Sequence, residues 1–343
     1  MGGEGTAREA VTDSSSTQAA PQVENEEGVA GGRVERLLLG LDFTMGFGNY
    51  ASVQSQLGVS GAVYPDYLFA DSQIRTTSFV LFGHYQFDKF GIGARMPLIS
   101  AHIADAGGNL HGEDIFTNGN LELSFDMPRR LSPQVRYIPE IALDIPLAPG
   151  LTPPTTQAEL SSKTVQTTQQ QMLDAQALQD GYNRYASGLA AAIARGGEDD
   201  ALYYNWRLGV VPKVGFDMKF NHTKIQPYIK VPIMFGLEES PAAEEPVRVE
   251  AVAGVRVAQE IGPVQLGVRL VGMVPIASRT GGAADTGQIQ LRDPMLSVWP
   301  EIRVQFTPSA KFWVAGMIPL AGDFNVFQDG NNGSFIAGLS ATF

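Results

Sequence analysis

Residue types that catalyse reactions are few in this chain and lie far apart in its sequence. The histidines are His84, His102, His111 and His222, there is no cysteine, and no Gly-x-Ser-x-Gly or His-x-x-x-His motif occurs. A nucleophile needs a general base within hydrogen-bonding reach, and no local spacing supplies such a pair. The sequence therefore predicts no enzyme and no cofactor, and it predicts a hydrogen bond inside the protein for His84.

Two acidic segments contain residue types that bind cations. Residues 102–114 hold two histidines and three carboxylates, and residues 323–332 are rich in Asp and Asn. The second run does not have the spacing of an EF-hand loop, and its residues are also ordinary turn formers. We therefore interpret both segments as solvated loops and predict no metal site.

Apolar and polar residues alternate over many short segments. In residues 333–343, one parity holds Phe335, Ala337, Leu339, Ala341 and Phe343, whereas Ser, Gly and Thr occupy most positions between them. Side chains of a strand point alternately to its two faces, so this pattern predicts a strand with one apolar and one polar face.

The connections between these segments alternate between tight turns and long polar stretches. Strands are predicted at residues 34–47, 74–87, 89–100, 118–127, 134–147, 202–220, 223–237, 246–259, 262–277, 293–306, 310–320 and 333–343. Short turns on one rim and long loops on the other are typical of outer-membrane barrels, and an even strand number places both termini in the periplasm. The predicted fold class is all-β, an antiparallel up-and-down transmembrane β-barrel of about 12 strands.

The polar face of these strands is rich in charge. A charged side chain facing lipid near the membrane midplane costs about 2–4 kcal/mol, so the apolar face must be the one that meets lipid. The charged face then lines the interior. The predicted pore-lining residues are Asp42, His84, Arg95, Glu122, Arg136, Glu140, Asp144, Lys213, Lys230, Arg256, Arg269, Glu301 and Arg303.

Positive and negative residues are unevenly distributed around the predicted barrel. The first, fourth and fifth strands carry mainly carboxylates, whereas the sixth to ninth carry mainly Arg and Lys. Walls of opposite sign would set a field across the lumen that orients charged solutes. Alternatively, the two walls pair with each other and stabilise the barrel. Both interpretations fit the sequence.

A proline between apolar residues recurs near the long-loop end of alternate strands. Because proline removes a donor from the hydrogen-bond ladder, it is expected at edges, strand ends or bulges. A ring of such prolines predicts kinks that reshape the upper barrel, or it marks where strand pairing ends. The five predicted lumen prolines are Pro97, Pro146, Pro232, Pro275 and Pro319.

One long connection, residues 148–201, contains a helical pattern. Apolar residues recur at spacings of three and four, and glycines at 181, 196 and 197 interrupt and end the pattern; its apolar stripe is Leu178, Tyr182, Tyr185, Leu189 and Ile193. The stripe must be buried. One placement folds the segment into the pore mouth as a constriction, and the other packs it as an extracellular helical hairpin on neighbouring loops. We take the second as the expectation.

Composition limits the remaining classes of structure and partner. Residues 1–33 are polar and acidic, which predicts a disordered tail before a barrel domain at residues 34–343. The net charge of −12 disfavours nucleic acid, which needs a basic face. No run approaches the ~20 apolar residues of a transmembrane helix.

The span from residue 34 to Phe343 resembles Gram-negative outer-membrane β-barrels. Phe335, Leu339 and Phe343 match the phase of the C-terminal signal by which the barrel assembly machinery recognises such proteins, whereas Ala341 stands where a larger residue is usual. The proline-apolar strand ends are similar to those of barrel transporters of the aromatic-degradation type. The resemblance implies insertion into outer-membrane lipid and passage of small solutes.

These observations favour a porin-like outer-membrane channel or transporter that passes small solutes through a charged lumen. The rival hypothesis is a non-conducting scaffold or surface-interaction protein, in which the same charges form a plug of salt bridges. An enzyme that cleaves lipid at His84 is the third hypothesis.

Overall fold

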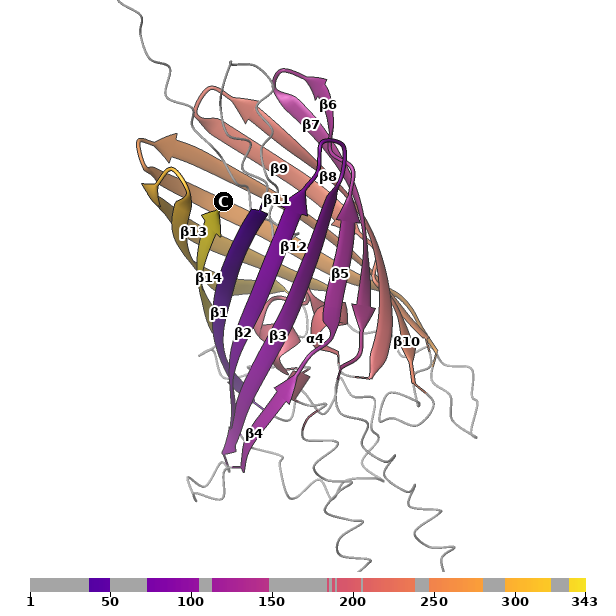
Figure 1. Ribbon diagram of the computed structural model, residues 1–343. Coiled ribbons are helices and arrows are strands. Elements are labelled where there is room, and N and C mark those ends of the chain that lie inside the picture. Colours follow the sequence, from indigo (N-terminus) through magenta and orange to yellow (C-terminus); the bar gives the residue numbers. More distant parts are fainter. Residues whose placement is uncertain are drawn as a thin grey trace, which may run out of the picture.

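The protein is a closed antiparallel β-barrel in a computed structural model that describes residues 37–49, 73–104, 113–147, 184, 187–188, 190–204, 206–237, 247–279, 294–321 and 333–343. The predicted tail of residues 1–33 and most of residues 148–201 lie outside the described residues. Figure 1 shows the strands tilted around a common axis.

Fifteen strand elements form the barrel wall. They are β1 (Leu37–Asn49), β2 (Gln73–Gln86), β3 (Gly91–Ala104), β4 (Glu113–Asn118), β5 (Leu121–Asp126), β6 (Arg129–Ser132), β7 (Val135–Ile145), β8 (Arg207–Phe220), β9 (Thr223–Lys230), β10 (Ile233–Gly236), β11 (Val247–Ile261), β12 (Val264–Arg279), β13 (Met295–Thr307), β14 (Ala310–Ala321) and β15 (Gly333–Thr342). Because β4, β5 and β6 are successive pieces of one barrel strand and β9 and β10 of another, the barrel has 15 − 3 = 12 strands. The predicted fold class is confirmed.

The first and last strands close the ring. β1 pairs with β15 in one continuous register from Leu38↔Thr342 to Phe47↔Gly333. The backbone N–H of Phe343 also donates to the carbonyl of Leu37 over 2.8 Å. Closure leaves no unpaired sheet edge, which is what a β-structure needs to lie in lipid.

The short turns all lie at one end of the barrel. They connect β2 to β3, β6 to β7, β8 to β9, β11 to β12 and β13 to β14. Four of them lie where the sequence predicted a turn, whereas residues 129–132, predicted as part of a turn, form β6 and leave the turn at residues 133–134. Asn221 and Gly262 have positive φ angles of 54° and 60° in two of these turns. The C-terminus lies at the same end, whereas β4 projects from the other (Figure 1).

Large apolar side chains are exposed on the outside of every strand. Examples from around the ring are Leu41, Leu81, Ile141, Ile229 and Ile318. Aromatic rings add contacts near the short-turn end, where Phe87 stacks on Phe90 and Phe306 lies near Phe312. Exposed apolar surface on this scale is typical of contact with lipid, with aromatic residues at the interface.

The five lumen prolines all coincide with irregularities of the sheet. Pro275 and Pro319 lie at register shifts of β12 and β14, and Pro232 lies in the break between β9 and β10. Pro146 directly follows β7. Pro97 faces the break between β4 and β5, where its carbonyl accepts the N–H of Gly119. The prolines thus mark both bulges and strand ends, because each lacks the N–H that a regular ladder uses.

One predicted strand begins later than expected. The sequence predicted a strand from residue 202, but β8 begins at Arg207. Residues 202 and 203 belong instead to a short helix, α4 (Asp200–Tyr203), whose side chains are buried. Figure 1 shows α4 inside the ring of strands. No helix among the described residues is long and apolar enough to cross a membrane.

Candidate functional site

Residues 190–204, called the inner segment from here on, lie inside the barrel. Every one of them is buried. This described end of the long connection therefore takes the inward placement, and the expected extracellular packing does not hold for it. The remainder of the predicted helical hairpin, including Leu178 and Tyr182, lies outside the described residues.

Two glycines shape the inner segment. Residues 190–194 are helical, and Gly196 and Gly197 then adopt φ angles of 70° and 69°, which ordinary side chains disfavour. Their N–H groups donate to the carbonyls of Ile193 and Ala192 over 2.8 and 3.1 Å. The turn ends the helix and presents Arg195 and the following two carboxylates to the wall.

Asp199 connects two non-adjacent strands of the wall. Its Oδ1 lies 3.2 Å from Nζ of Lys230 on β9 and 3.3 Å from Nη2 of Arg95 on β3. Its Oδ2 lies 3.4 Å from Nε of Arg195, within the inner segment. Burial alone would raise the pKa of Asp199, but these three cations hold the pKa of its carboxyl well below the ordinary value. Asp199 is therefore an anion inside the barrel.

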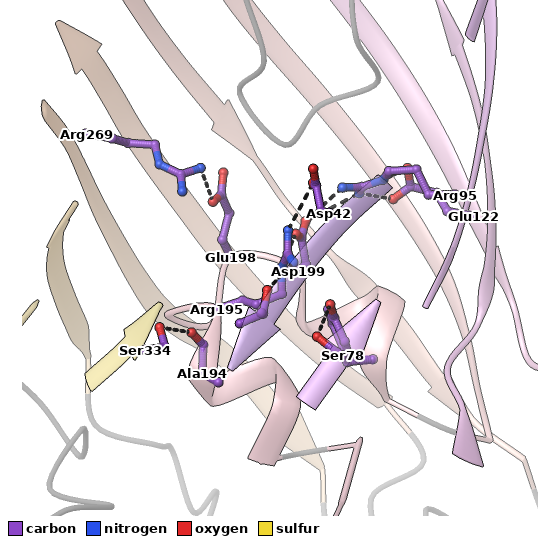
Figure 2. Close-up of polar contacts among 12 residues, drawn as sticks. Asp42, Ser78, Arg95, Glu122, Ala194, Arg195, Glu198, Asp199, Arg269 and Ser334 are labelled. Atoms are coloured by element: carbon purple, nitrogen blue, oxygen red, sulfur yellow. Dashed lines mark hydrogen bonds and ion pairs between the residues drawn. The ribbon is translucent and has the colours of Figure 1, made fainter. Parts of the chain in front are cut away.

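Glu198 makes a second attachment to a different part of the wall. Nη1 of Arg269 on β12 donates to Oε2 of Glu198 over 2.7 Å, as Figure 2 shows. The hydroxyl of Tyr228 donates to Oε1 over 2.5 Å. The guanidinium of Arg269 also lies over the ring of Trp299, 4.6 Å from its centroid. Charge-assisted hydrogen bonds of this kind are stronger than neutral ones.

Arg195 attaches the inner segment to β1. Its Nη1 donates to Oγ1 of Thr44 over 2.7 Å, and its Nη2 lies 3.7 Å from Oδ2 of Asp42. In Figure 2 the guanidinium lies between Asp42 and Asp199. The inner segment therefore uses one cation and two anions, each on a wall partner of opposite charge.

The break between β4 and β5 holds the backbone of α4. Asn120 lies in this break, and its Nδ2 donates to the carbonyls of Ala201, Tyr204 and Arg207 over 2.7, 3.0 and 2.9 Å. Its own N–H donates to the carbonyl of Leu202 over 2.8 Å. A single buried amide thus joins the backbone of α4 and the start of β8 to the wall.

Further contacts tie the helical end to the last strand and to β2. Oγ of Ser334 on β15 donates to the carbonyl of Ala194 over 2.5 Å (Figure 2). The hydroxyls of Ser78 and Tyr203 lie 3.2 Å apart. Apolar side chains form a cluster around these polar contacts, including Ile193 and Leu202 of the inner segment and, from the wall, Val80, Ile99, Met234, Val252, Met273 and Trp299.

All thirteen predicted pore-lining residues lie on the inward face of the barrel. Four of them touch the inner segment directly, namely Asp42, Arg95, Lys230 and Arg269. His84 is buried and its Nε2 lies 2.7 Å from Oδ2 of Asp126, which agrees with the predicted lumen hydrogen bond. The others are Glu122, Arg136, Glu140, Asp144, Lys213, Arg256, Glu301 and Arg303.

The wall charges pair mainly with their neighbours along the sheet. Arg95 binds Glu122 on the adjacent strand, and Lys213 lies 3.1 Å from Glu140 on another adjacent pair. Arg256 reaches Glu301 across β12 because Gly267 between them has no side chain. The non-adjacent strands β3 and β9 are linked by the inner segment, through Asp199.

Sequence patterns missed the inner segment's own charges and Asn120. The helical pattern pointed to Gly196 and Gly197 as its end, but nothing in the periodicity marked the next residues as partners of the wall. The run from Gly196 to Asp200 does carry a signal, since three carboxylates directly after a helix-ending glycine pair are available to meet a basic surface.

Comparison with known proteins gives a likeness of fold. No protein-family model and no curated protein matches the chain. An outer membrane channel from Pseudomonas putida F1 matches with a TM-score of 0.56 and 13% identity, over 93% of this chain and 100% of that one. The transport unit of the autotransporter AIDA-I from Escherichia coli has a TM-score of 0.45 and 7% identity, over 92% of both chains. The first likeness shows that this chain has the fold of an outer-membrane β-barrel.

Proposed function

We propose that the protein is an outer-membrane channel for small solutes, closed in this structure by the inner segment and opened when that segment leaves its wall contacts. The observation that carries the proposal is the polar character of the attachment. Arg195, Glu198 and Asp199 hold the segment through ion pairs with the wall. A part of the protein held in this way is able to exchange its contacts for water.

The surfaces uncovered by such a movement favour a hydrated path. The wall would expose Asp42, Arg95, Lys230 and Arg269, all of which water solvates well, whereas a barrel with an apolar interior could not fill with water without a large penalty. Charged rings are the usual means by which pores select and pass solutes. The buried charges of the lumen are thus those of a path for polar solutes.

The outside of the barrel supports a place in the outer membrane with both termini in the periplasm. Short turns face the periplasm in bacterial barrels, and both chain ends of a barrel with an even number of strands lie on that side. Phe335, Leu339 and Phe343 are exposed on the outer surface, where the barrel assembly machinery would meet the C-terminal strand. The likeness of the strand ends to barrel transporters of the aromatic-degradation type favours small organic solutes.

A second candidate function is a non-conducting scaffold. The apolar contacts of the inner segment favour it, because Ile193, Leu202 and Tyr203 pack against wall residues such as Ile99 and Met273. In this case the segment would be a permanent part of the core.

A reversible disulfide cross-link distinguishes the channel from the scaffold. The chain has no cysteine, and Ala194 and Ser334 are in contact, so Ala194→Cys with Ser334→Cys would join the inner segment to β15. In planar bilayers we expect openings under reducing conditions and their loss on oxidation, with the single variant Ser334→Cys insensitive to the oxidant. A silent bilayer under both conditions would overturn the channel.

A further inference from the structure

We propose that Lys230 and Arg269 form a binding site for a small organic acid, and that Glu198 and Asp199 of the inner segment occupy this site in the closed barrel. The inference rests on the proposed channel function and names its solute class. Each inner carboxylate takes the place that a carboxylate of the solute would take.

Lys230 and Arg269 differ from neighbouring basic residues of the wall in their partners. Lys230 pairs with Asp199, and Arg269 pairs with Glu198. Among the described residues, neither cation forms an ion pair with a wall carboxylate. The basic wall residues nearby are different: Arg95 also binds Glu122, and Arg256 binds Glu301. When the inner segment leaves, Lys230 and Arg269 lose the carboxylates of Asp199 and Glu198, and two cations of the wall without counterions attract an anion.

The hydrogen-bond donors of the site are suited to a carboxylate. The site offers an ammonium group, a guanidinium group and the hydroxyl of Tyr228, which donates to Glu198 over 2.5 Å. Guanidinium groups bind carboxylates with two parallel hydrogen bonds. The ring of Trp299 lies under Arg269 and fixes its orientation. Because two neighbouring carboxylates are held in the closed state, a small dicarboxylate is able to fill both positions.

Solute binding and closure are therefore mutually exclusive. A carboxylate on Lys230 or Arg269 removes the attachment of Asp199 or Glu198, so the solute shifts the equilibrium towards the open barrel. A ligand shifts such an equilibrium only by its differential affinity for the two states, and this site exists for the solute in the open state alone. The solute would thus open its own path.

Succinate in planar bilayers tests the proposal. Sodium succinate should raise the open probability of the unaltered protein several-fold over sodium chloride at equal ionic strength. The double variant Lys230→Gln with Arg269→Gln should open more often, since docking is weakened, but should no longer respond to succinate. Lys224→Gln neutralises a buried lysine near the short-turn end and should keep the response.

A second measurement keeps the inference separate from the channel function. Glu198→Gln with Asp199→Asn frees both wall cations, so reversal potentials in a KCl gradient should show preference for the anion. Openings that neither respond to succinate nor prefer anions would overturn the organic-acid site and leave the channel standing. If neither protein opens under any condition, the channel function fails, and the inference fails with it.

Discussion

Asp199 lies 3.2 Å from Lys230, although one belongs to the inner segment and the other to the barrel wall. The pair lies inside the barrel. An ion there that loses its partner is neither hydrated nor paired, which destabilises the closed state. Removing one member of such a pair typically costs about 3–5 kcal/mol. The closed state is therefore sensitive to single charges.

The two glycines of the inner segment should not tolerate side chains. Gly196→Ala places a Cβ at a φ of 70° and 3.0 Å from Oγ of Ser297 and Cζ2 of Trp299. Left-handed backbone costs about 1–2 kcal/mol for an ordinary residue, and the close contact adds to it. We expect amide hydrogen exchange of residues 190–204 to accelerate at least tenfold.

Gly262→Ala is the matched control for this substitution. Gly262 has a φ of 60° in a turn at the other end, with nothing within 4 Å of an added Cβ. It should destabilise its own turn and leave exchange of the inner segment unchanged. Equal acceleration by both variants would show that Gly196 has no special part in docking.

Asn120→Asp should release α4 from the wall. The substitution keeps the side-chain shape but replaces the Nδ2 that donates to Ala201, Tyr204 and Arg207 with an oxygen that repels their carbonyls. Loss of buried hydrogen bonds costs about 1–3 kcal/mol. Hydrogen exchange of residues 200–204 should rise accordingly. Asn118→Asp, which alters one 3.3 Å bond to Gly119, should change it far less.

A lysine on the outer surface should destabilise the barrel more when it lies deeper in the membrane. Ile229 is 51% exposed in the middle of a barrel strand, and Leu131 is 62% exposed near the short-turn rim. Ile229→Lys should lower the free energy of unfolding in lipid vesicles by about 2–4 kcal/mol, and Leu131→Lys by about 0–1 kcal/mol. Equal effects in urea titrations would contradict the assignment of this face to lipid.

Asp199 should continue to stabilise the docked inner segment at mildly acidic pH. Its pKa in the closed state is below its ordinary value because of Arg95, Lys230 and Arg195, so its ionised form favours docking above the ordinary pKa of ~3.9. That contribution is lost only as pH falls through the lowered pKa. The ratio of open probabilities between Asp199→Asn and the unaltered protein should stay constant from about pH 8 to about pH 4.5. A ratio that collapses near pH 6 would contradict it.

The strands were predictable because their apolar and polar residues alternate with a period of two, and because a charged side chain on the wrong face would lie in lipid at a high free-energy cost. A charge at Arg269 or Glu301 cannot face lipid, so alternation alone assigns the inward face of each strand. Register follows from the tight turns, as at Gly262. Predicted strand boundaries were wrong where tertiary contacts outweigh the local pattern. Asn120 interrupts a strand and binds α4. Residues 202 and 203, predicted as the start of β8, belong to the inner segment.

The placement of the inner segment was beyond sequence reasoning for a different reason. An apolar stripe such as the one containing Ile193 requires burial but does not say against what. The placement of the segment depends on contacts between residues far apart in the chain, such as Arg195 with Asp42 and Glu198 with Arg269. Such partners are determined by barrel closure, which no local pattern encodes.

Single-channel recording of Glu198→Gln with Asp199→Asn tests the central claim most directly. Asp126→Asn with Glu260→Gln is the control, because it neutralises two inward carboxylates near the short-turn end that do not bind the inner segment. We expect the first double variant to raise the open probability at least tenfold over the unaltered protein, with little change in the control. An unchanged, silent barrel in the first variant would contradict the claim that these two carboxylates hold the channel closed.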